Sequence, residues 1–193
     1  MNRSSVNKIP KPKVLKAALA LFSSKGYAET KMTEIAQAVG ISVGTLYLRF
    51  KNKEGLFLDL CKEQGPEFDS LTNNLPYHDP LKALKAYIAL NLEFALKKRQ
   101  LLSMFIREHR LPFLRPLRNN FLNSQQKVIH NILISGVKKG IFRKVDTRET
   151  AYMIFACIRG AILLKHVFGI GDPQTMSNSL FKLITNGIRK DLS

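Results

Sequence analysis

The chain lacks most of the features from which a chemical function is usually inferred. It has no tryptophan and two cysteines, Cys61 and Cys157, which lie far apart and form no C-x-x-C pair. We therefore expect neither a disulfide framework nor a zinc site. The four histidines are scattered without H-E-x-x-H spacing, and there is no Walker-type or G-x-G-x-x-G loop. The sequence predicts no metal, no cofactor and no enzyme activity.

Acidic residues are also scarce. The 193 residues include 31 Lys and Arg against 14 Asp and Glu, which gives a formal net charge of +17. Such an excess favours a polyanionic partner, namely nucleic acid, an anionic membrane surface or an acidic ligand. The net charge alone does not choose among these three.

Long uncharged apolar runs are absent as well. Runs such as Ala151 to Ile158 are far shorter than the roughly 20 residues that span a bilayer. The stretch from Val14 to Phe22 superficially resembles a signal peptide, but Lys16 interrupts it and no small-residue cleavage site follows. The composition, 45% hydrophobic and 23% charged, is ordinary for a globular protein. We expect a cytoplasmic protein with no membrane partner.

Apolar residues recur at helical spacing along almost the whole chain, and Gly and Pro divide the pattern into helices. In the first part we expect helices from about Pro12 to Lys25, a short one ended by Gly40, Val43 to about Phe50, and one from Lys53 that Gly65-Pro66 should kink or break. The later helices are predicted at about 80–97, 100–110, 117–139, 147–168 and 173–190. The predicted fold class is all-α with about nine helices, divided into an N-terminal domain over 1–55 and a C-terminal helical domain over 56–193.

Two of the short helices, joined by a tight turn at Gly40-Ile41-Ser42, predict a helix-turn-helix. In this motif the first helix braces the second, whose exposed face enters the major groove of DNA. Ser42 is a suitable N-cap for the second helix, and Asn52 for the helix that follows. The small core that fixes the two helices is predicted to comprise Ile35, Ala36, Val39, Ile41, Leu46 and Phe50.

The exposed face of the second helix carries groups suited to DNA. Gly44 allows close approach, Thr45 can bond a base edge or a phosphate, and Val43 can pack against a thymine methyl group. The Tyr47 hydroxyl suits a phosphate oxygen, and Lys51 and Lys53 add cations just past the helix.

Helix-turn-helix patterns also occur in proteins that do not bind DNA, so the charge of this domain matters. Residues 1–55 hold ten Lys and Arg against three Asp and Glu, the electrostatic footprint of phosphate binding. Lys16 and Lys25 are expected only to be solvated. The arm residues Arg3, Lys8 and Lys11 either reach a minor groove or form a disordered tail.

The same stretch resembles the TetR family of bacterial regulators. The family implies a three-helix DNA-binding domain, a fourth connecting helix, and a C-terminal helical domain that dimerises and usually holds a small-molecule inducer. It also implies that Val43, Gly44 and Thr45 face the groove, and that Tyr47 and Lys53 contact phosphates. The matching run, with its spacing preserved, is Ala17-Ala-Leu-Ala-Leu-Phe22, Gly26-Tyr27, Thr30, Ile35-Ala36, Gly40-Ile-Ser-Val-Gly-Thr-Leu-Tyr47 and Phe50-Lys-Asn-Lys-Glu-Gly-Leu-Phe57.

Two positions depart from the family pattern. Arg49 stands where His or Tyr is common, and Lys31 stands near a position where the family often has Ser or Thr. We therefore expect the phosphate contact that the family implies at this position to come from Lys31 or Thr33. These departures affect the operator sequence rather than DNA binding itself. The predicted DNA-binding residues are Lys31, Thr33, Ser42, Val43, Gly44, Thr45, Tyr47, Arg49, Lys51 and Lys53.

The C-terminal domain is rich in aromatic and aliphatic residues between positions 84 and 121. They form either plain helical core or an apolar cavity of the kind that ligands occupy between helices. Residues 97–118 also hold seven basic residues against the single acid Glu108. A basic rim around an apolar hole suits an amphipathic anion such as a fatty acid or an acyl-CoA, although the same residues can simply be solvated. The predicted ligand-binding residues are Tyr87, Phe94, Met104, Phe105, Arg107, Phe113 and Phe121.

The last two predicted helices have broader apolar stripes than one protomer needs. Ile154, Ile158 and Ile162 lie on one stripe, and Leu180 and Leu183 on the other. Packing against a second copy in a four-helix interface, over residues 147–190, would bury both stripes. A two-fold dimer places two heads on half-sites in successive major grooves, so the operator should be palindromic.

The leading hypothesis is therefore a homodimeric transcriptional repressor that binds a palindromic double-stranded DNA operator. An unidentified small-molecule ligand would tilt the helix after Phe50, change the spacing of the heads and release the DNA. The alternative is a non-specific nucleic-acid or anionic-membrane binder with no inducer.

Overall fold

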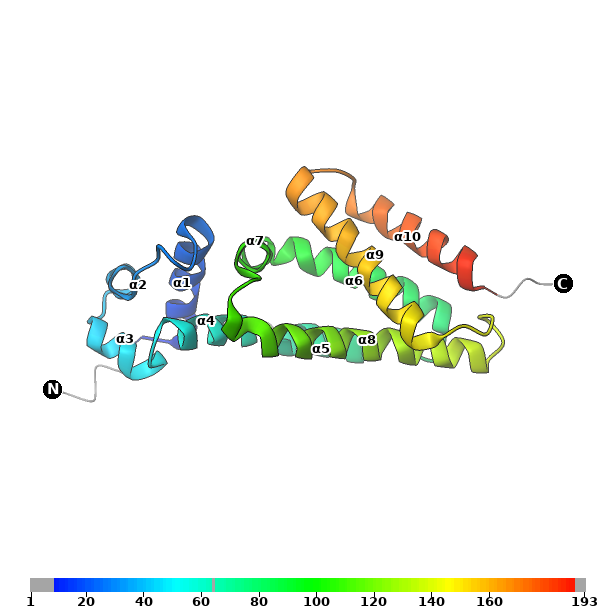
Figure 1. The fold of residues 1–193 in the computed structure, drawn as a ribbon, viewed down its shortest axis with the longest axis horizontal. Helices are drawn as coiled ribbons and strands as arrows, with labels where there is room; N and C mark the ends of the chain where they lie inside the picture. Colours follow the sequence, from blue (N-terminus) through cyan, green and yellow to red (C-terminus); the bar gives the residue numbers. More distant parts are fainter. Residues whose placement is uncertain (1–8, 64, 190–193) are drawn as a thin grey trace. The chain divides into compact units, whose positions relative to one another are not determined.

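The computed structural model describes residues 9–63 and 65–189, and these are almost entirely helical. Within them the extended backbone pairing is an isolated bridge between Phe142 and Arg189, which confirms the predicted all-α class. In chain order (Figure 1) the helices are α1 Lys11–Lys25, α2 Met32–Val39, α3 Val43–Phe50, α4 Lys53–Lys62, α5 Gly65–Asn73, α6 Pro80–Lys97, α7 Arg99–Glu108, η2 Pro112–Leu114, α8 Arg115–Lys138, α9 Thr147–Phe168 and α10 Pro173–Ile188.

Short polar side chains set the starts of the helices. The Ser42 hydroxyl accepts the Thr45 N–H at 3.1 Å, and Asn52 Oδ1 accepts the Gly55 N–H at 2.7 Å, so both predicted N-caps are confirmed. Asp146 and Asp172 cap α9 and α10 in the same way. Their backbone N–H donors hold the pKa of each carboxyl below its ordinary value.

The chain divides into two compact units. The first consists of the residues up to Glu67 together with Lys98–Arg115, and the second of Phe68–Lys97 together with the residues from Pro116 onward. Helix α7 and η2 therefore belong with the N-terminal helices, and the chain passes from one unit to the other three times. The boundary predicted after residue 55 falls inside α4.

In the first unit, α1 packs against α2, α4 and α7. Phe22, Tyr27, Phe57 and Phe113 form an aromatic cluster whose contacting ring centroids are 5.0–5.9 Å apart. The helix-turn-helix core is as predicted except at Ile41, which is only half-buried. Its fully buried members are Ile35, Ala36, Val39, Leu46 and Phe50.

In the second unit, α6 packs against α9 and α10. A Cβ at Gly136 would lie 2.0 Å from the Phe142 ring, so this glycine allows Phe142 to close the end of α8. By length and composition α9 is the one helix of the described residues that could cross a membrane, although Arg159 and Lys165 interrupt its apolar run. Only 28% of its most apolar window is buried within the protomer.

Candidate nucleic-acid interface

Helix α3 separates a buried face from an exposed one. Leu46 and Phe50 are buried against the rest of the motif, whereas Tyr47 is 45% exposed and Leu48 is 76% exposed. Gly44 is exposed and Val43 is half-buried. An eight-residue helix that leaves a large apolar side chain such as Leu48 in solvent has a face available for another molecule.

The first turn of α3 is held in place by its own side chains. The hydroxyl oxygens of Ser42 and Thr45 lie 2.8 Å apart, and Ser42 also accepts the Thr45 N–H. The Thr45 hydroxyl is therefore oriented before any contact with a base or phosphate is made. Ser42 contributes mainly as the N-cap of the helix.

Four of the predicted DNA-binding residues line one open hollow of about 330 Å³. They are Lys31, Thr33, Tyr47 and Lys53, and the other lining residues are Ala28, Thr30 and Met32. The hollow includes the start of α2, where the first backbone N–H groups of a helix have no acceptor within the helix and attract phosphate. The arrangement suits a backbone phosphate at the side of the recognition helix.

Glu34, which follows the lining residue Thr33, is an acid whose charge is already compensated. Glu34 accepts the Lys31 backbone N–H at 3.0 Å and forms an ion pair with Lys25. These contacts, led by the Lys25 hydrogen bond, lower the pKa of Glu34. Lys25 was expected only to be solvated, and it instead offsets a carboxylate that would otherwise repel phosphate.

Lys53 has a different role from the phosphate contact that the family resemblance implied. Its Nζ donates to the carbonyl oxygens of Tyr27 at 2.7 Å, Ala28 at 3.1 Å and Thr30 at 3.0 Å, and lies 4.5 Å from the centre of the Tyr27 ring. An ammonium group has three N–H donors, so these carbonyls occupy all of them. Lys53 fastens the start of α4 to the loop between α1 and α2.

The remaining cations of the predicted set divide in a similar way. Arg49 is half-buried and donates to the Ile9 carbonyl at 2.6 Å, which ties the chain before α1 to α3. Lys51 is exposed at the C-terminus of α3, with a positive φ of 59°. Of the predicted arm residues, Arg3 and Lys8 lie outside the described residues, and Lys11 pairs with Asp59 at 2.9 Å.

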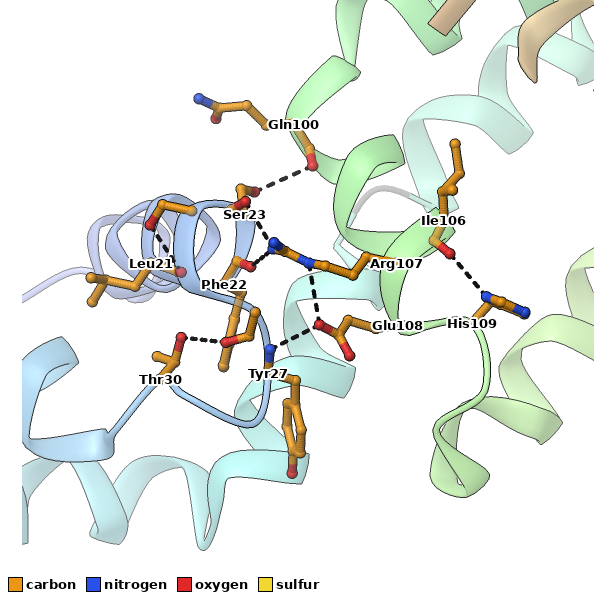
Figure 2. A network of polar contacts seen from close by, with 12 residues as sticks. Leu21, Phe22, Ser23, Tyr27, Thr30, Gln100, Ile106, Arg107, Glu108 and His109 are labelled. Atoms are coloured by element: carbon orange, nitrogen blue, oxygen red, sulfur yellow. Dashed lines mark hydrogen bonds and ion pairs between the residues drawn. The ribbon is translucent and has the colours of Figure 1, made fainter. Parts of the chain in front are cut away.

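Side chains of helix α7 hold the last turn of α1 and the start of the loop between α1 and α2 (Figure 2). Arg107 donates to the carbonyl oxygens of Phe22 and Ser23 in the last turn of α1, the second at 2.8 Å. Glu108 lies 3.4 Å from Arg107 and accepts the Tyr27 N–H at 2.9 Å. Arg107 thereby adds a charged donor to the Phe22 carbonyl, which also accepts the Gly26 N–H, and to the Ser23 carbonyl at the C-terminal end of α1.

The seven predicted ligand-binding residues belong to two different units. Arg107 holds α1, and Phe113 packs on Tyr27 and Phe57 in the first unit. Tyr87, Phe94 and Phe121 belong to the second unit, where Tyr87 is fully buried and Phe121 is 40% exposed. Met104 and Phe105 lie on α7.

Sequence reasoning missed one cation of the second unit. The Arg159 guanidinium on α9 lies 5.9 Å from the ring centre of Phe121 and 6.0 Å from that of Phe155. Its signal was available, because it is the one charged residue between Glu149 and Lys165 on a helix that is otherwise apolar. Among the described residues no cluster of three His, Cys, Asp or Glu is placed to hold a metal ion.

Comparison with known proteins agrees with this geometry. Residues 14–60, which cover α1 to most of α4, match the family model of bacterial regulatory proteins of the tetR family. The chain is 30% identical over 142 residues to an uncharacterized HTH-type transcriptional regulator, YerO, of Bacillus subtilis, covering 70% of this chain and about half of that relative, 49%. It is 26% identical over 186 residues to the fatty acid metabolism regulator protein of the same organism, covering 91% of this chain and 93% of that protein.

Solved structures of transcriptional regulators also resemble most of the chain. The crystal structure of the transcriptional regulator FadR from Bacillus subtilis, in complex with stearoyl-CoA, matches with a TM-score of 0.79 and 25% identity, covering 93% of this chain and all of that one. These relatives are transcriptional regulators, and they favour a sequence-reading DNA binder over a non-specific polyanion binder.

Two lysines with the same charge should respond differently to neutralisation. Lys51→Gln should leave the thermal stability unchanged, lower DNA affinity and reduce the salt slope of log K by about 1, because one exposed phosphate cation is lost. Lys53→Gln should lower the free energy of unfolding by about 1–3 kcal/mol, because three carbonyls lose a charged donor. Thermal denaturation and DNA titration at several salt concentrations measure both; an unaltered melting temperature for Lys53→Gln would contradict the assignment.

Proposed function

Because the chain belongs to the TetR family of bacterial transcriptional regulators, we propose that it is a cytoplasmic, dimeric repressor that binds a palindromic operator. It acts by binding rather than by catalysis, and a small molecule held in the second unit releases it from DNA. The observation that carries the proposal is the exposed face of α3 beside the hollow lined by Lys31, Thr33 and Tyr47.

In this proposal α3 lies in the major groove. Val43 and Gly44 approach the bases, Thr45 bonds a base edge or a phosphate, and the exposed Leu48 adds an apolar contact on the same face. Phosphates bind the Tyr47 hydroxyl, the start of α2 and the exposed Lys51. Arg49 and Lys53 act indirectly, since their hydrogen bonds to backbone carbonyls hold the motif in position.

The signal between ligand and DNA is proposed to pass through α7. This helix continues α6 and is followed by η2 and α8, so both its ends lead into the second unit. Its own side chains Arg107 and Glu108 hold the end of α1 and the start of the following loop. A ligand that prefers one position of α6 and α8 thereby favours one position of the DNA-reading helices.

Dimerisation is proposed through α9 and α10. Several large apolar side chains of this region are exposed in the protomer: Met153 (54%), Val167 (51%), Phe168 (63%), Ile170 (56%) and Leu183 (68%). A soluble protein rarely leaves such a cluster in water, and a second copy related by two-fold symmetry covers it with the same surface. Two heads then read two half-sites.

Operator recognition can be tested on the DNA upstream of the chain's own gene. We expect a palindromic segment of it to bind about 10³-fold or more tightly than a scrambled sequence of the same length at physiological salt. Thr45→Ala should reduce this ratio if Thr45 bonds a base edge, and should weaken both sequences equally if it bonds a phosphate. Equal affinity for the two sequences across a salt titration would favour the non-specific binder instead.

The dimer can be tested by placing a charge on its face. Phe168→Glu or Leu183→Glu should give a monomer in analytical ultracentrifugation at micromolar concentration, because a carboxylate in an apolar interface is costly to desolvate. Operator affinity should fall at least about 100-fold with it, since a single head retains one half-site. Leu71→Glu changes an exposed leucine of α5 and should leave the dimer intact. A stable dimer in both α9 and α10 variants would exclude this interface.

The role of α7 can be tested without knowing the ligand. Arg107→Gln should speed amide hydrogen exchange at Tyr27 and Thr30 by roughly fivefold, the equivalent of about 1 kcal/mol of local stability. Operator affinity should fall with it. Arg110→Gln removes the same charge from an exposed position near the end of α7 and is the matched control. Identical exchange in the two variants would remove α7 from the pathway.

A further inference from the structure

Arg159 is a half-buried cation of the second unit that lies against two aromatic rings, those of Phe121 and Phe155. Lys82 and Lys85 of α6 are exposed by comparison; Lys82 pairs with Asp79, and Lys85 lies over the single ring of Phe181. No carboxylate of the described residues forms an ion pair with it, and burial lowers its pKa. The half-buried Arg159 is therefore partly desolvated without a carboxylate partner, and an anion that binds from solvent would compensate its charge.

The nearest polar groups do not neutralise this charge. Tyr87 interacts electrostatically with Arg159, but burial raises the pKa of the Tyr87 hydroxyl, which therefore stays neutral at pH 7. The hydroxyl donates to Gln125 Oε1 at 2.7 Å, and Asn91 Nδ2 donates to the Tyr87 carbonyl at 2.9 Å. Tyr87, Asn91 and Gln125 are each at most 4% exposed, so a layer of buried neutral polar groups adjoins the half-buried Arg159 and supplies no anion.

An apolar surface adjoins this layer. Phe121 of α8 lies 6.3 Å from both Phe155 of α9 and Phe68 of α5, and Phe68 lies 4.9 Å from Phe94 of α6. The four rings therefore connect four helices of the second unit. Phe121 is 40% exposed, so solvent reaches the cluster. Hydrocarbon can pack on such rings while the neighbouring guanidinium binds a carboxylate or phosphate through two parallel hydrogen bonds.

We propose that Arg159 is the anion-binding residue of the ligand site, and that the ligand is an amphiphile with an anionic head and an alkyl tail on the Phe68, Phe94, Phe121 and Phe155 rings. The inference rests on the proposed function in so far as that function places a ligand in the second unit. It places the residue that recognises the charge of the ligand on α9 rather than in the 97–118 segment, where Arg107 instead holds α1.

The same rings would suit a quaternary ammonium ligand if they stood alone, because aromatic faces attract cations. Arg159 excludes that class by repulsion, since its positive charge faces Phe121 and Phe155 at about 6 Å. A neutral alkyl ligand would leave the guanidinium without a counter-ion. The charge therefore selects among ligands that share the same tail.

The test is calorimetric titration of the full chain without DNA, using probes with one tail and different heads. Dodecanoate and dodecyl phosphate distinguish a carboxylate from a phosphate head, dodecan-1-ol is the neutral probe, and choline is the cation. We expect one of the two anions to bind at least about tenfold more tightly than the alcohol, and choline to give no heat. Arg159→Gln should weaken binding of that anion by about 10- to 100-fold and leave the alcohol unchanged, because a charge-assisted hydrogen-bond pair is lost.

Two variants keep the experiment decisive. Arg159→Lys retains the charge and should recover part of the anion affinity that Arg159→Gln loses. Lys127→Gln removes an exposed charge of α8 and should leave the anion affinity unchanged. The ligand-free Arg159→Gln protein should melt no lower than the wild type, since it no longer partly desolvates an unpaired charge. The proposal would be overturned if Arg159→Gln lost affinity for the anion and for the alcohol to the same extent. It would also be overturned if the wild type bound neither anion, or if Arg159→Gln became a monomer. Because DNA is absent, failure of operator recognition leaves this result unaffected.

Discussion

The backbone of the loop between α1 and α2 contains polar groups that no helix satisfies, and its position depends on side chains from elsewhere in the chain. Lys53 supplies donors to the carbonyls of Tyr27, Ala28 and Thr30, and the Thr30 hydroxyl donates to the Gly26 carbonyl at 2.6 Å. From α7, Glu108 accepts the Tyr27 N–H. Because unpaired buried backbone groups are costly, these contacts fix where α2 begins and hence where α3 is presented.

This constraint divides the basic residues of the head into two kinds. Residues of the first kind, such as Lys53 and Arg49, donate hydrogen bonds to the protein's own backbone carbonyls. The other, including Lys31 and Lys51, remains exposed beside the recognition helix. A high net charge therefore overstates the number of phosphate contacts. The positive field of both kinds still attracts DNA, because field strength does not depend on which atoms accept the hydrogen bonds.

Local features of the structure could be predicted well from the sequence. The Ser42 and Asn52 caps, the turn at Gly40 and all the predicted buried positions of the helix-turn-helix except Ile41 follow from short-range rules of geometry and spacing. The role of α7 could not, because the contact of Arg107 with Phe22 joins residues that are distant in the chain and no periodicity encodes the pairing. Arg159 is less conspicuous in the sequence than the seven basic residues of 97–118, because it is a single charge on an apolar helix.

The discontinuous first unit has a consequence for how such proteins can be recombined. A head cut from the chain after α4 carries the whole helix-turn-helix, yet it leaves behind the Arg107 and Glu108 side chains that hold the end of α1. Grafting it onto the body of another regulator therefore transfers the reading surface without its support, unless the recipient offers an equivalent pair on its own α7. The α7 side chains are therefore part of the head, although they come from the middle of the chain.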